Sequence, residues 1–166
     1  MRRLAEQVLD EVECHGFAPP RLSVEPGRAI VGNAGVALYT IGAIKAIPGL
    51  RTYVSLDGGM ADNIRPALYG ARYEALLANR ADEAPAGPVT LAGKYCESGD
   101  VLIKDVPLPE PRSGDLVALP ASGAYNLAMS SNYNWAYRPA VVVVNDGRAR
   151  LVRRRETIED LLAAEL

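Results

Sequence analysis

Residues 93–100, Gly-Lys-Tyr-Cys-Glu-Ser-Gly-Asp, place a thiol next to a carboxylate in a loop with a glycine near each end. The Cys96 thiol can donate a proton or attack a carbon atom, and the Glu97 carboxylate can bind an ammonium group. The glycines let the backbone approach a ligand closely. Because a cysteine in a folded protein is more often a small buried hydrophobe than a catalyst, this loop alone favours a structural role.

A second candidate is the tetrapeptide Glu25-Pro26-Gly27-Arg28, which lies between an expected strand and an expected helix. Backbone N–H groups at the start of a helix bind phosphate, and Gly27 would permit close approach. The Arg28 guanidinium can bind a carboxylate or a phosphate through two hydrogen bonds. The alternative is an ordinary strand-to-helix turn with an exposed Glu/Arg pair, and the tetrapeptide alone slightly favours it.

Two further segments combine glycine with polar and aromatic residues. Arg65 and Tyr69 lie four positions apart in the glycine-rich segment 57–70, so they share one face if the segment is helical and together could bind an anion. Tyr125 follows Gly-Ala in the segment 122–126, and the segment 129–134 after it is polar, aromatic and small. The alternatives are a solvated arginine and packed tyrosines with satisfied hydroxyls.

The elements that must position these residues change character near residue 35. Apolar residues recur at helical spacing over residues 4–12, residues 22–24 are a short strand candidate, and residues 29–34 indicate a short helix. This order is typical of an α/β unit. One such unit cannot form a sheet alone, so we interpret residues 1–35 as the end of something larger.

Residues 36–166 favour a mostly antiparallel β domain followed by a helix, and the fold class is therefore mainly β (α+β). The turn Asn145-Asp146-Gly147 predicts a hairpin. A final helix is expected from Thr157 to near residue 166, residues 66–69 are a connection, residues 79–87 a loop, and residues 73–78 a strand or a helix. The expected strands are residues 36–47, 51–56, 89–92, 101–103, 115–119, 140–144 and 148–152.

Composition limits the classes of function. The chain has 166 residues and a net charge of −2 with no basic block, which argues against nucleic acid or an anionic membrane as a partner. No signal peptide and no apolar run of about 20 residues is present, so we expect a cytoplasmic protein. One histidine and two cysteines, Cys14 and Cys96, predict neither a metal site nor a disulfide framework.

The four segments, in this order, resemble the fold-type III pyridoxal-phosphate-dependent decarboxylases, and most closely those acting on diaminopimelate. The resemblance runs from about residue 22 to residue 162. It implies that residues 1–35 are a remnant of the family's N-terminal (β/α)8 barrel. Residues 36–166 would be its C-terminal β-barrel or sandwich domain with a final helix.

The resemblance also implies roles for the candidate residues. Cys96 matches the family's proton donor, which acts in the active site of the partner subunit. Glu97 together with Arg65 and Tyr69 favours diaminopimelate, because a distal zwitterion needs both an anion and a cation. The residues matched to binding of pyridoxal 5'-phosphate are Glu25, Pro26, Gly27, Arg28 and Tyr125. Those matched to substrate binding are Arg28, Arg65, Tyr69, Glu97 and Tyr125.

One departure from the family changes the expected function. The lysine that forms the Schiff base precedes the matched part, and Lys45, Lys94 and Lys104 match non-catalytic positions. We therefore expect the C-terminal part of a decarboxylase that converts meso-diaminopimelate to L-lysine and CO2. This part would contribute site residues across a dimer interface, would not bind the cofactor covalently and would be inactive alone.

Two alternatives stay open. The chain could be a stand-alone non-catalytic paralogue that associates with a full-length decarboxylase, or it could belong to a family member that acts on another amino acid. In either case the expected partners are a second copy or a barrel-containing chain, and a small amino-acid substrate.

Overall fold

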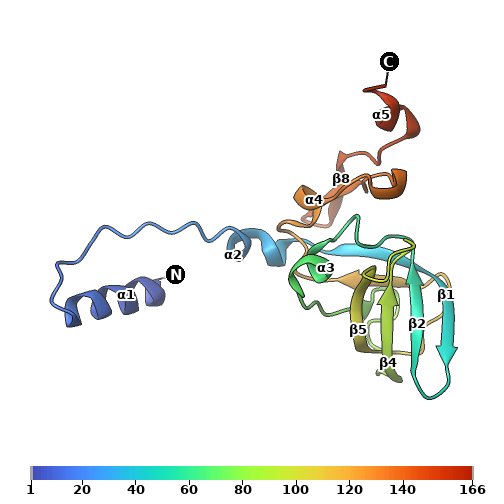
Figure 1. Cartoon of the computed structure of the whole chain (residues 1–166), viewed down its shortest axis with the longest axis horizontal. Coiled ribbons are helices and arrows are strands. Elements are labelled where there is room, and N and C mark those ends of the chain that lie inside the picture. The colour runs from blue at the N-terminus through green and yellow to red at the C-terminus, as the bar shows by residue number, and fades with distance from the viewer. Residues whose placement is uncertain (1, 166) are drawn as a thin grey trace.

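The computed structural model describes residues 2–165 and shows a β domain with an arm at each end of the chain (Figure 1). The N-terminal arm holds helix α1 (Arg2–Cys14), which has no buried residue and lies away from the sheet. An extended segment leads from it to α2 (Arg28–Val31) and the 3₁₀ turn η1 (Gly32–Ala34). The two predicted helices are thereby confirmed, with the second beginning at Arg28.

The predicted strand at residues 22–24 is wrong. The backbone there is extended but belongs to no strand pair among the described residues. A strand needs a neighbour to satisfy its N–H and C=O groups, and residues 2–165 supply none at this position. Sequence propensity alone could not show whether a pairing partner was present.

Six strands form one curled sheet in the order β3-β6-β1-β2-β4-β5. The pairs are antiparallel except β2 with β4, which is parallel, so the mainly β, mostly antiparallel prediction is confirmed. The register of β1 with β2 shifts between Ile41 and Ile44, and such a bulge bends a sheet. The strands are β1 (Ala37–Ile47), β2 (Arg51–Leu56), β3 (Leu76–Leu77), β4 (Gly87–Ala92), β5 (Val101–Leu108) and β6 (Leu116–Leu119).

The C-terminal arm begins with a separate hairpin of β7 (Val141–Asn145) and β8 (Arg148–Arg153). Its turn has φ of 48° at Asp146 and 71° at Gly147, the left-handed geometry that the sequence predicts for a tight hairpin. The last helix, α5 (Ile158–Leu162), starts with a capping box but ends earlier than predicted. No residue of α5 is buried, so packing does not extend the helix.

Three short helices differ from the sequence prediction. The expected connection at residues 66–69 is part of α3 (Arg65–Tyr69), which has proline in its first turn and ends at Gly70 with φ of 61°. The ambiguous segment 73–78 contains only β3. Two further elements, α4 (Asn126–Met129) and η2 (Tyr133–Trp135), occupy a stretch for which no helix was predicted.

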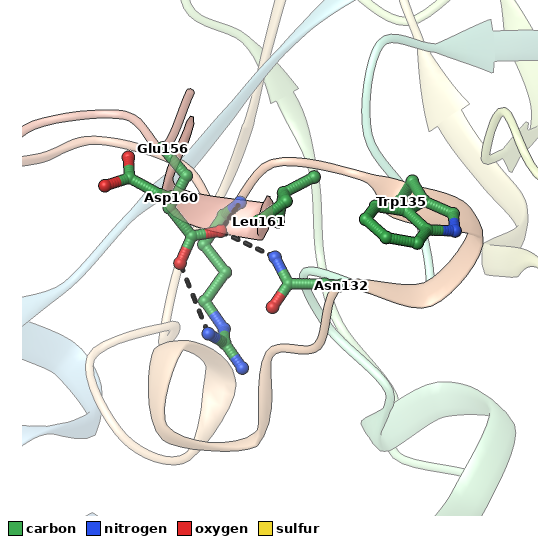
Figure 2. Close-up of a pocket in the computed structure, with 6 residues that line it drawn as sticks. Asn132, Trp135, Glu156, Asp160 and Leu161 are labelled. Carbon is green, nitrogen blue, oxygen red and sulfur yellow. Dashed lines mark hydrogen bonds and ion pairs between the residues drawn. The ribbon is translucent and has the colours of Figure 1, made fainter. Parts of the chain in front are cut away.

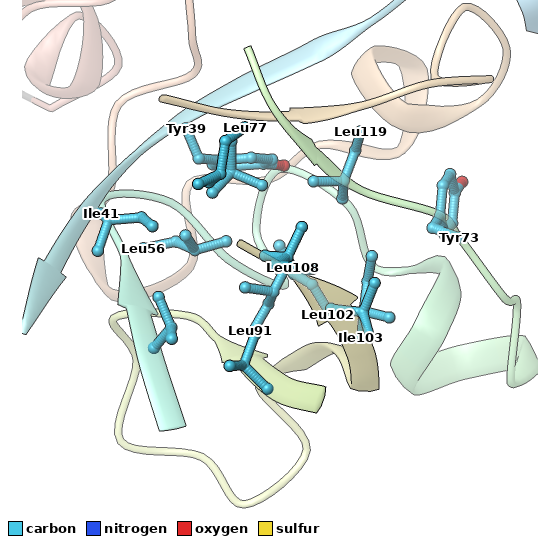
Figure 3. Packing of buried hydrophobic residues seen from close by; sticks show 14 residues of the cluster. Tyr39, Ile41, Leu56, Tyr73, Leu77, Leu91, Leu102, Ile103, Leu108 and Leu119 are labelled. Carbon is cyan, nitrogen blue, oxygen red and sulfur yellow. The ribbon is translucent and has the colours of Figure 1, made fainter. Parts of the chain in front are cut away.

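The core lies inside the curl of the sheet (Figure 3). Tyr39 and Ile41 of β1 point inward at alternate positions, as a strand with one buried face requires. Val54 and Leu91 are completely buried on the paired strands β2 and β4. The core therefore holds the strands whose ends carry the candidate loops.

A buried ion pair fixes the loop that follows β3. Asp115 is 5% exposed and accepts hydrogen bonds from Arg80 Nη2 at 2.6 Å, Asn79 Nδ2 at 3.0 Å and the Arg112 backbone amide at 2.8 Å. Burial raises the pKa of Asp115, but these donors outweigh it and hold the pKa below the usual 3.8. The ionised carboxylate is thus the form that the fold stabilises.

We expect this pair to make folding acid-sensitive. Since the folded pKa of Asp115 lies below its unfolded value, the stabilisation is present above about pH 4 and is lost as pH falls through the folded pKa. Urea unfolding should show Asp115→Asn to be destabilised at pH 7 and closer to wild type at pH 3. Asp105→Asn is the control, because the Asp105 side chain is 57% exposed in its pair with Arg51. An Asp115→Asn effect that is equal at both pH values would contradict the assignment.

Candidate functional site

The loop 93–100 is organised around the buried carboxylate of Asp100, which is 3% exposed. Its Oδ1 accepts a hydrogen bond from the Met60 amide at 2.7 Å, and its Oδ2 accepts one from the Tyr95 amide at 2.8 Å. The backbone amide of Asp100 donates to Glu97 O at 3.0 Å, which closes the turn. Burial raises the pKa of Asp100, and the two amides oppose that effect. Asp100 therefore ties the loop to the segment after β2.

Two glycines make room for this carboxylate. A Cβ on Gly93 would lie 2.2 Å from both Asp100 carboxylate oxygens, and a Cβ on Gly59 would lie 2.5 Å from Oδ1. Contacts that short do not occur, so any larger residue would displace Asp100. The glycine that the sequence suggested for close approach to a ligand instead accommodates a side chain of the same loop.

Cys96 and Glu97 are exposed at the tip of the loop. The Tyr133 hydroxyl donates a hydrogen bond to Glu97 Oε1, and Asn134 Nδ2 lies 3.9 Å from Cys96 Sγ. Tyr133 also packs edge-on against Tyr95, with ring centroids 5.7 Å apart. The thiol and the carboxylate are thus both free to meet a ligand and both contacted by the same short segment.

Arg65 lies between two aromatic rings. Its Cζ is 5.6 Å from the ring centroid of Tyr69 and 5.5 Å from that of Tyr125. The predicted helical face that joins Arg65 to Tyr69 is therefore present in α3. The buried Nε of Arg65 has no hydrogen-bond partner among residues 2–165, so this donor of the guanidinium is unsatisfied within that range.

Tyr125 connects this cation to the tetrapeptide 25–28. A Cβ on Gly27 would lie 2.2 Å from Tyr125 Oη, so the hydroxyl fills the space beside this glycine. Tyr125 has φ of 68° and Gly27 has φ of 46°, so the backbone is unusual both at this tyrosine and at the glycine that its hydroxyl meets. Arg28 reaches the same region, with Nη2 3.5 Å from Ala121 O.

The other two residues of the tetrapeptide, Glu25 and Pro26, make fewer contacts with the candidate site. Glu25 is exposed, and Pro26 O accepts the Ala29 amide at 3.0 Å to start α2. Within residues 2–165, the predicted site residues form two groups. One contains Gly27, Arg28, Arg65, Tyr69 and Tyr125, and the other contains Cys96 and Glu97.

No hydrogen bond or ion pair in this part of the chain joins the two groups. The segments that carry them lie close together, since a Cβ built on Gly99 would be 4.0 Å from Ala67 Cβ of α3.

Three residues of the site were not singled out by the sequence. In the sequence, Asp100 only ends the motif 93–100, and Tyr133 and Asn134 only belong to the polar, aromatic segment 129–134. Tyr133 contacts Glu97 and Asn134 contacts Cys96, and these pairs are 36 and 38 positions apart in the sequence. Gly93, seven positions before Asp100, was the one signal in the same loop that pointed to a buried partner.

A pocket lies apart from these groups, on the C-terminal arm (Figure 2). Glu156 accepts hydrogen bonds there from Asn132 Nδ2 at 2.6 Å and from the Arg138 amide at 2.8 Å, and these donors hold its pKa below the usual range. Because Glu156 already has these partners, the pocket serves to attach the arm. Trp135, Asp160 and Leu161 complete its lining.

Two negative findings apply to residues 2–165. No group of three His, Cys, Asp or Glu side chains is placed to hold a metal ion. No helix in the same range is long and apolar enough to cross a membrane.

The sequence and the fold match a known family of proteins. A family model described as the C-terminal sheet domain of pyridoxal-dependent decarboxylases matches residues 8–123. The match covers more than half of the chain, and the chain therefore belongs to this family.

The relatives that match this chain in sequence are diaminopimelate decarboxylases. The diaminopimelate decarboxylase of Bacillus subtilis (strain 168) is 52% identical over 166 residues, which are 100% of this chain and 38% of the relative. A crystal structure of a diaminopimelate decarboxylase is 39% identical with a TM-score of 0.80, covering 97% of this chain and 41% of the other. The M. jannaschii enzyme in complex with L-lysine is 34% identical with a TM-score of 0.81, covering 94% and 36%. The chain thus spans well under half the length of these relatives.

The residues present fit one part of pyridoxal phosphate and not another. Gly27, the Tyr125 hydroxyl and the Arg28 guanidinium together offer donors suited to a phosphate. Covalent attachment needs a lysine nearby. Lys45 on β1 and Lys104 on β5 are exposed, and Lys94 Nζ lies 5.8 Å from the ring centroid of Tyr95, in the other group.

Proposed function

We propose that this chain supplies the C-terminal part of the active site of a diaminopimelate decarboxylase, which converts meso-diaminopimelate to L-lysine and CO2. The observation that carries the proposal is the placement of Arg65 between the rings of Tyr69 and Tyr125, with the Tyr125 hydroxyl beside Gly27. In a chain 52% identical to a diaminopimelate decarboxylase, this cluster offers a cation and hydroxyls for anionic groups. Residues 1–35 are assigned to the end of the barrel and residues 36–166 to the sheet domain.

Arg65 is assigned to the distal carboxylate of the substrate. The Tyr69 and Tyr125 rings flank its guanidinium and restrict its motion, and its buried Nε has no hydrogen-bond partner within residues 2–165. Arg28 and Tyr125 are assigned to both the phosphate of the cofactor and the substrate. Glu25 and Pro26 shape the turn that presents Gly27.

Glu97 is assigned to the distal ammonium group and Cys96 to proton delivery. A carboxylate paired with the Arg65 cation would satisfy both charges of a distal amino acid. The Cys96 thiol would hold the proton that replaces CO2 on the α-carbon. Since Cys96 and Glu97 form a group separate from Arg65 and Tyr125, we infer that they serve the site of a second subunit in a dimer.

The cofactor, when bound, supplies an electron-withdrawing ring that stabilises the negative charge left as CO2 departs. In this chain Gly27, Arg28 and Tyr125 would bind its phosphate and orient it. With no lysine placed beside them, we propose that the chain needs a barrel-containing chain for activity and is inactive alone. The compartment expected for such a biosynthetic enzyme is the cytoplasm.

Reconstitution tests this function. The chain is mixed with a separately expressed barrel part of a diaminopimelate decarboxylase and pyridoxal phosphate, and CO2 and L-lysine are measured. We expect activity with meso-diaminopimelate only in the mixture, and lower activity with ornithine, arginine or lysine. Arg65→Lys should raise KM by about tenfold or more, because lysine cannot reproduce the planar bidentate contact.

Arg72→Lys is the matched control, since Arg72 is exposed and makes no hydrogen bond or ion pair within residues 2–165. A stable complex without lysine formation would contradict the catalytic proposal and favour the non-catalytic paralogue. Preferred turnover of another amino acid would contradict the substrate assignment.

A further inference from the structure

A short segment after α4 contacts both exposed residues of the loop 93–100. The Tyr133 hydroxyl donates to Glu97 Oε1, and Asn134 Nδ2 lies 3.9 Å from Cys96 Sγ. Two successive residues of one segment thus meet two successive residues of the other. The proposed function assigns no role to Tyr133 or Asn134.

The segment holds this position in an unfavourable backbone conformation. Asn134 has φ of 51° and Trp135 has φ of 58°, in the left-handed region that a bulky residue rarely adopts. Such a conformation is energetically unfavourable and persists only where neighbouring contacts impose it. Strain of this kind is found preferentially at sites that must hold a defined geometry.

Contacts on both sides impose the conformation. The Ser131 amide donates to Ala61 O at 2.9 Å, which attaches the segment to the body of the domain. Asn132 Nδ2 donates to Ala136 O at 2.9 Å and to Glu156 Oε2 at 2.6 Å, which attaches it to the C-terminal arm (Figure 2). Tyr133 therefore approaches Glu97 from a fixed support.

The chemistry of the donor matters for what Glu97 can bind. The hydrogen bond to Glu97 raises the pKa of Tyr133 to about 12, so the phenol is neutral at neutral pH. A neutral donor orients the carboxylate without cancelling its charge, whereas a lysine or arginine would neutralise it. The bond uses Oε1 and leaves Oε2 for a cation.

We propose that Tyr133 is a positioning residue for substrate specificity, which fixes the Glu97 carboxylate beside Cys96 so that it receives the ammonium group of an amino-acid substrate. Holding the side chain in advance removes much of the rotamer entropy that a free glutamate loses when it binds a ligand. Asn134 holds the thiol at the other end of the same contact. This inference rests on the proposed roles of Glu97 and Cys96.

The first test uses the chain alone and needs no cofactor. In a Cys14→Ser background Cys96 is the sole thiol, and its reaction rates with a cationic and an anionic methanethiosulfonate reagent are compared. A carboxylate held beside the thiol favours the cationic reagent. We expect Tyr133→Phe to lower the cationic-to-anionic rate ratio by about threefold, towards the ratio of Glu97→Gln.

Tyr137→Phe is the matched control, because Tyr137 lies in the same segment and makes no hydrogen bond within the described residues. Its ratio should equal that of the background chain. Tyr133→Phe keeps the ring that packs on Tyr95, and circular dichroism and thermal melting check that it folds. A Tyr133→Phe ratio equal to the background would overturn the proposal, as would a Glu97→Gln ratio equal to the background.

The second test uses the reconstituted enzyme with meso-diaminopimelate. Tyr133→Phe should raise KM by about fivefold to tenfold and change kcat by less than about twofold, the pattern of lost substrate binding. An unchanged KM beside a raised KM in Glu97→Gln would overturn the role of Tyr133. An unchanged KM in Glu97→Gln would instead refute the proposed function of Glu97, and the reagent ratios would still decide whether Tyr133 positions it.

Discussion

Cys96→Ala is expected to lower kcat of the reconstituted decarboxylase by about 10²–10⁴-fold, the usual contribution of a positioned proton donor. The thiol is exposed at the tip of a loop that Asp100 holds in place, so alanine removes the proton donor without disturbing the fold. KM for meso-diaminopimelate should change little, because Cys96 is assigned to the reacting carbon and not to the distal group. Steady-state kinetics of CO2 release measure both quantities.

The second cysteine gives the control for this prediction. Cys14 is exposed on α1, outside both groups of site residues, so Cys14→Ala should leave kcat unchanged. Cys96→Ser replaces the thiol by a hydroxyl of higher pKa, so its kcat should lie between those of wild type and Cys96→Ala or equal that of Cys96→Ala. Full activity of Cys96→Ala would show that another group delivers the proton.

Much of the sheet could be predicted because its signals are local. Alternating apolar residues marked β1 and β2, and the Asn-Asp-Gly turn marked the hairpin of β7 and β8. The spacing of Arg65 and Tyr69 predicted a shared face only on the condition of a helix, and α3 meets that condition although residues 66–69 were expected to be a connection. These signals depend on steric preferences within a few residues, which the sequence states directly.

What could not be predicted depends on partners that are distant in sequence. Residues 22–24 have strand propensity but no neighbouring strand within the described chain. The hydrogen bond from Tyr133 to Glu97 joins residues 36 positions apart, and no sequence pattern near either residue predicts it. Asp100 could be taken for a loop carboxylate until its burial at 3% exposure was seen. A sequence motif indicates the residues that could face a ligand. The residues that hold those side chains in place are known only once the packing is known.

The separation of the two site groups follows from the same packing. Arg65 and Tyr125 meet at the sheet end near Gly27, while Cys96 and Glu97 extend from the loop after β4. Under the proposed function, each chain would present two incomplete sites. Pairing of two subunits, each with its barrel, would let one subunit's Cys96 complete the other's site, and we propose that dimer formation is a condition of catalysis.

Gly93→Ala is expected to destabilise the domain by about 3 kcal/mol and to reduce activity, although residue 93 contacts no substrate in the proposed site. Its Cβ would lie 2.2 Å from both carboxylate oxygens of Asp100, which is buried and held by two backbone amides. The carboxylate must move, and the hydrogen bonds to Met60 and Tyr95 are then weakened or lost. Urea unfolding measures the change in free energy.

Gly87→Ala is the matched control, since Gly87 begins β4, the strand that ends just before Gly93, and a Cβ there would meet no atom within 4 Å. A double-mutant cycle identifies the cause: if the clash with the carboxylate is responsible, Gly93→Ala should cost much less in an Asp100→Ala background. An equal cost in both backgrounds would refute the clash and imply a backbone effect of the methyl group. Because loop 93–100 carries Cys96, the destabilising variants should also lose turnover in proportion to how far Asp100 is displaced, which makes Asp100 the structural determinant of the thiol's position.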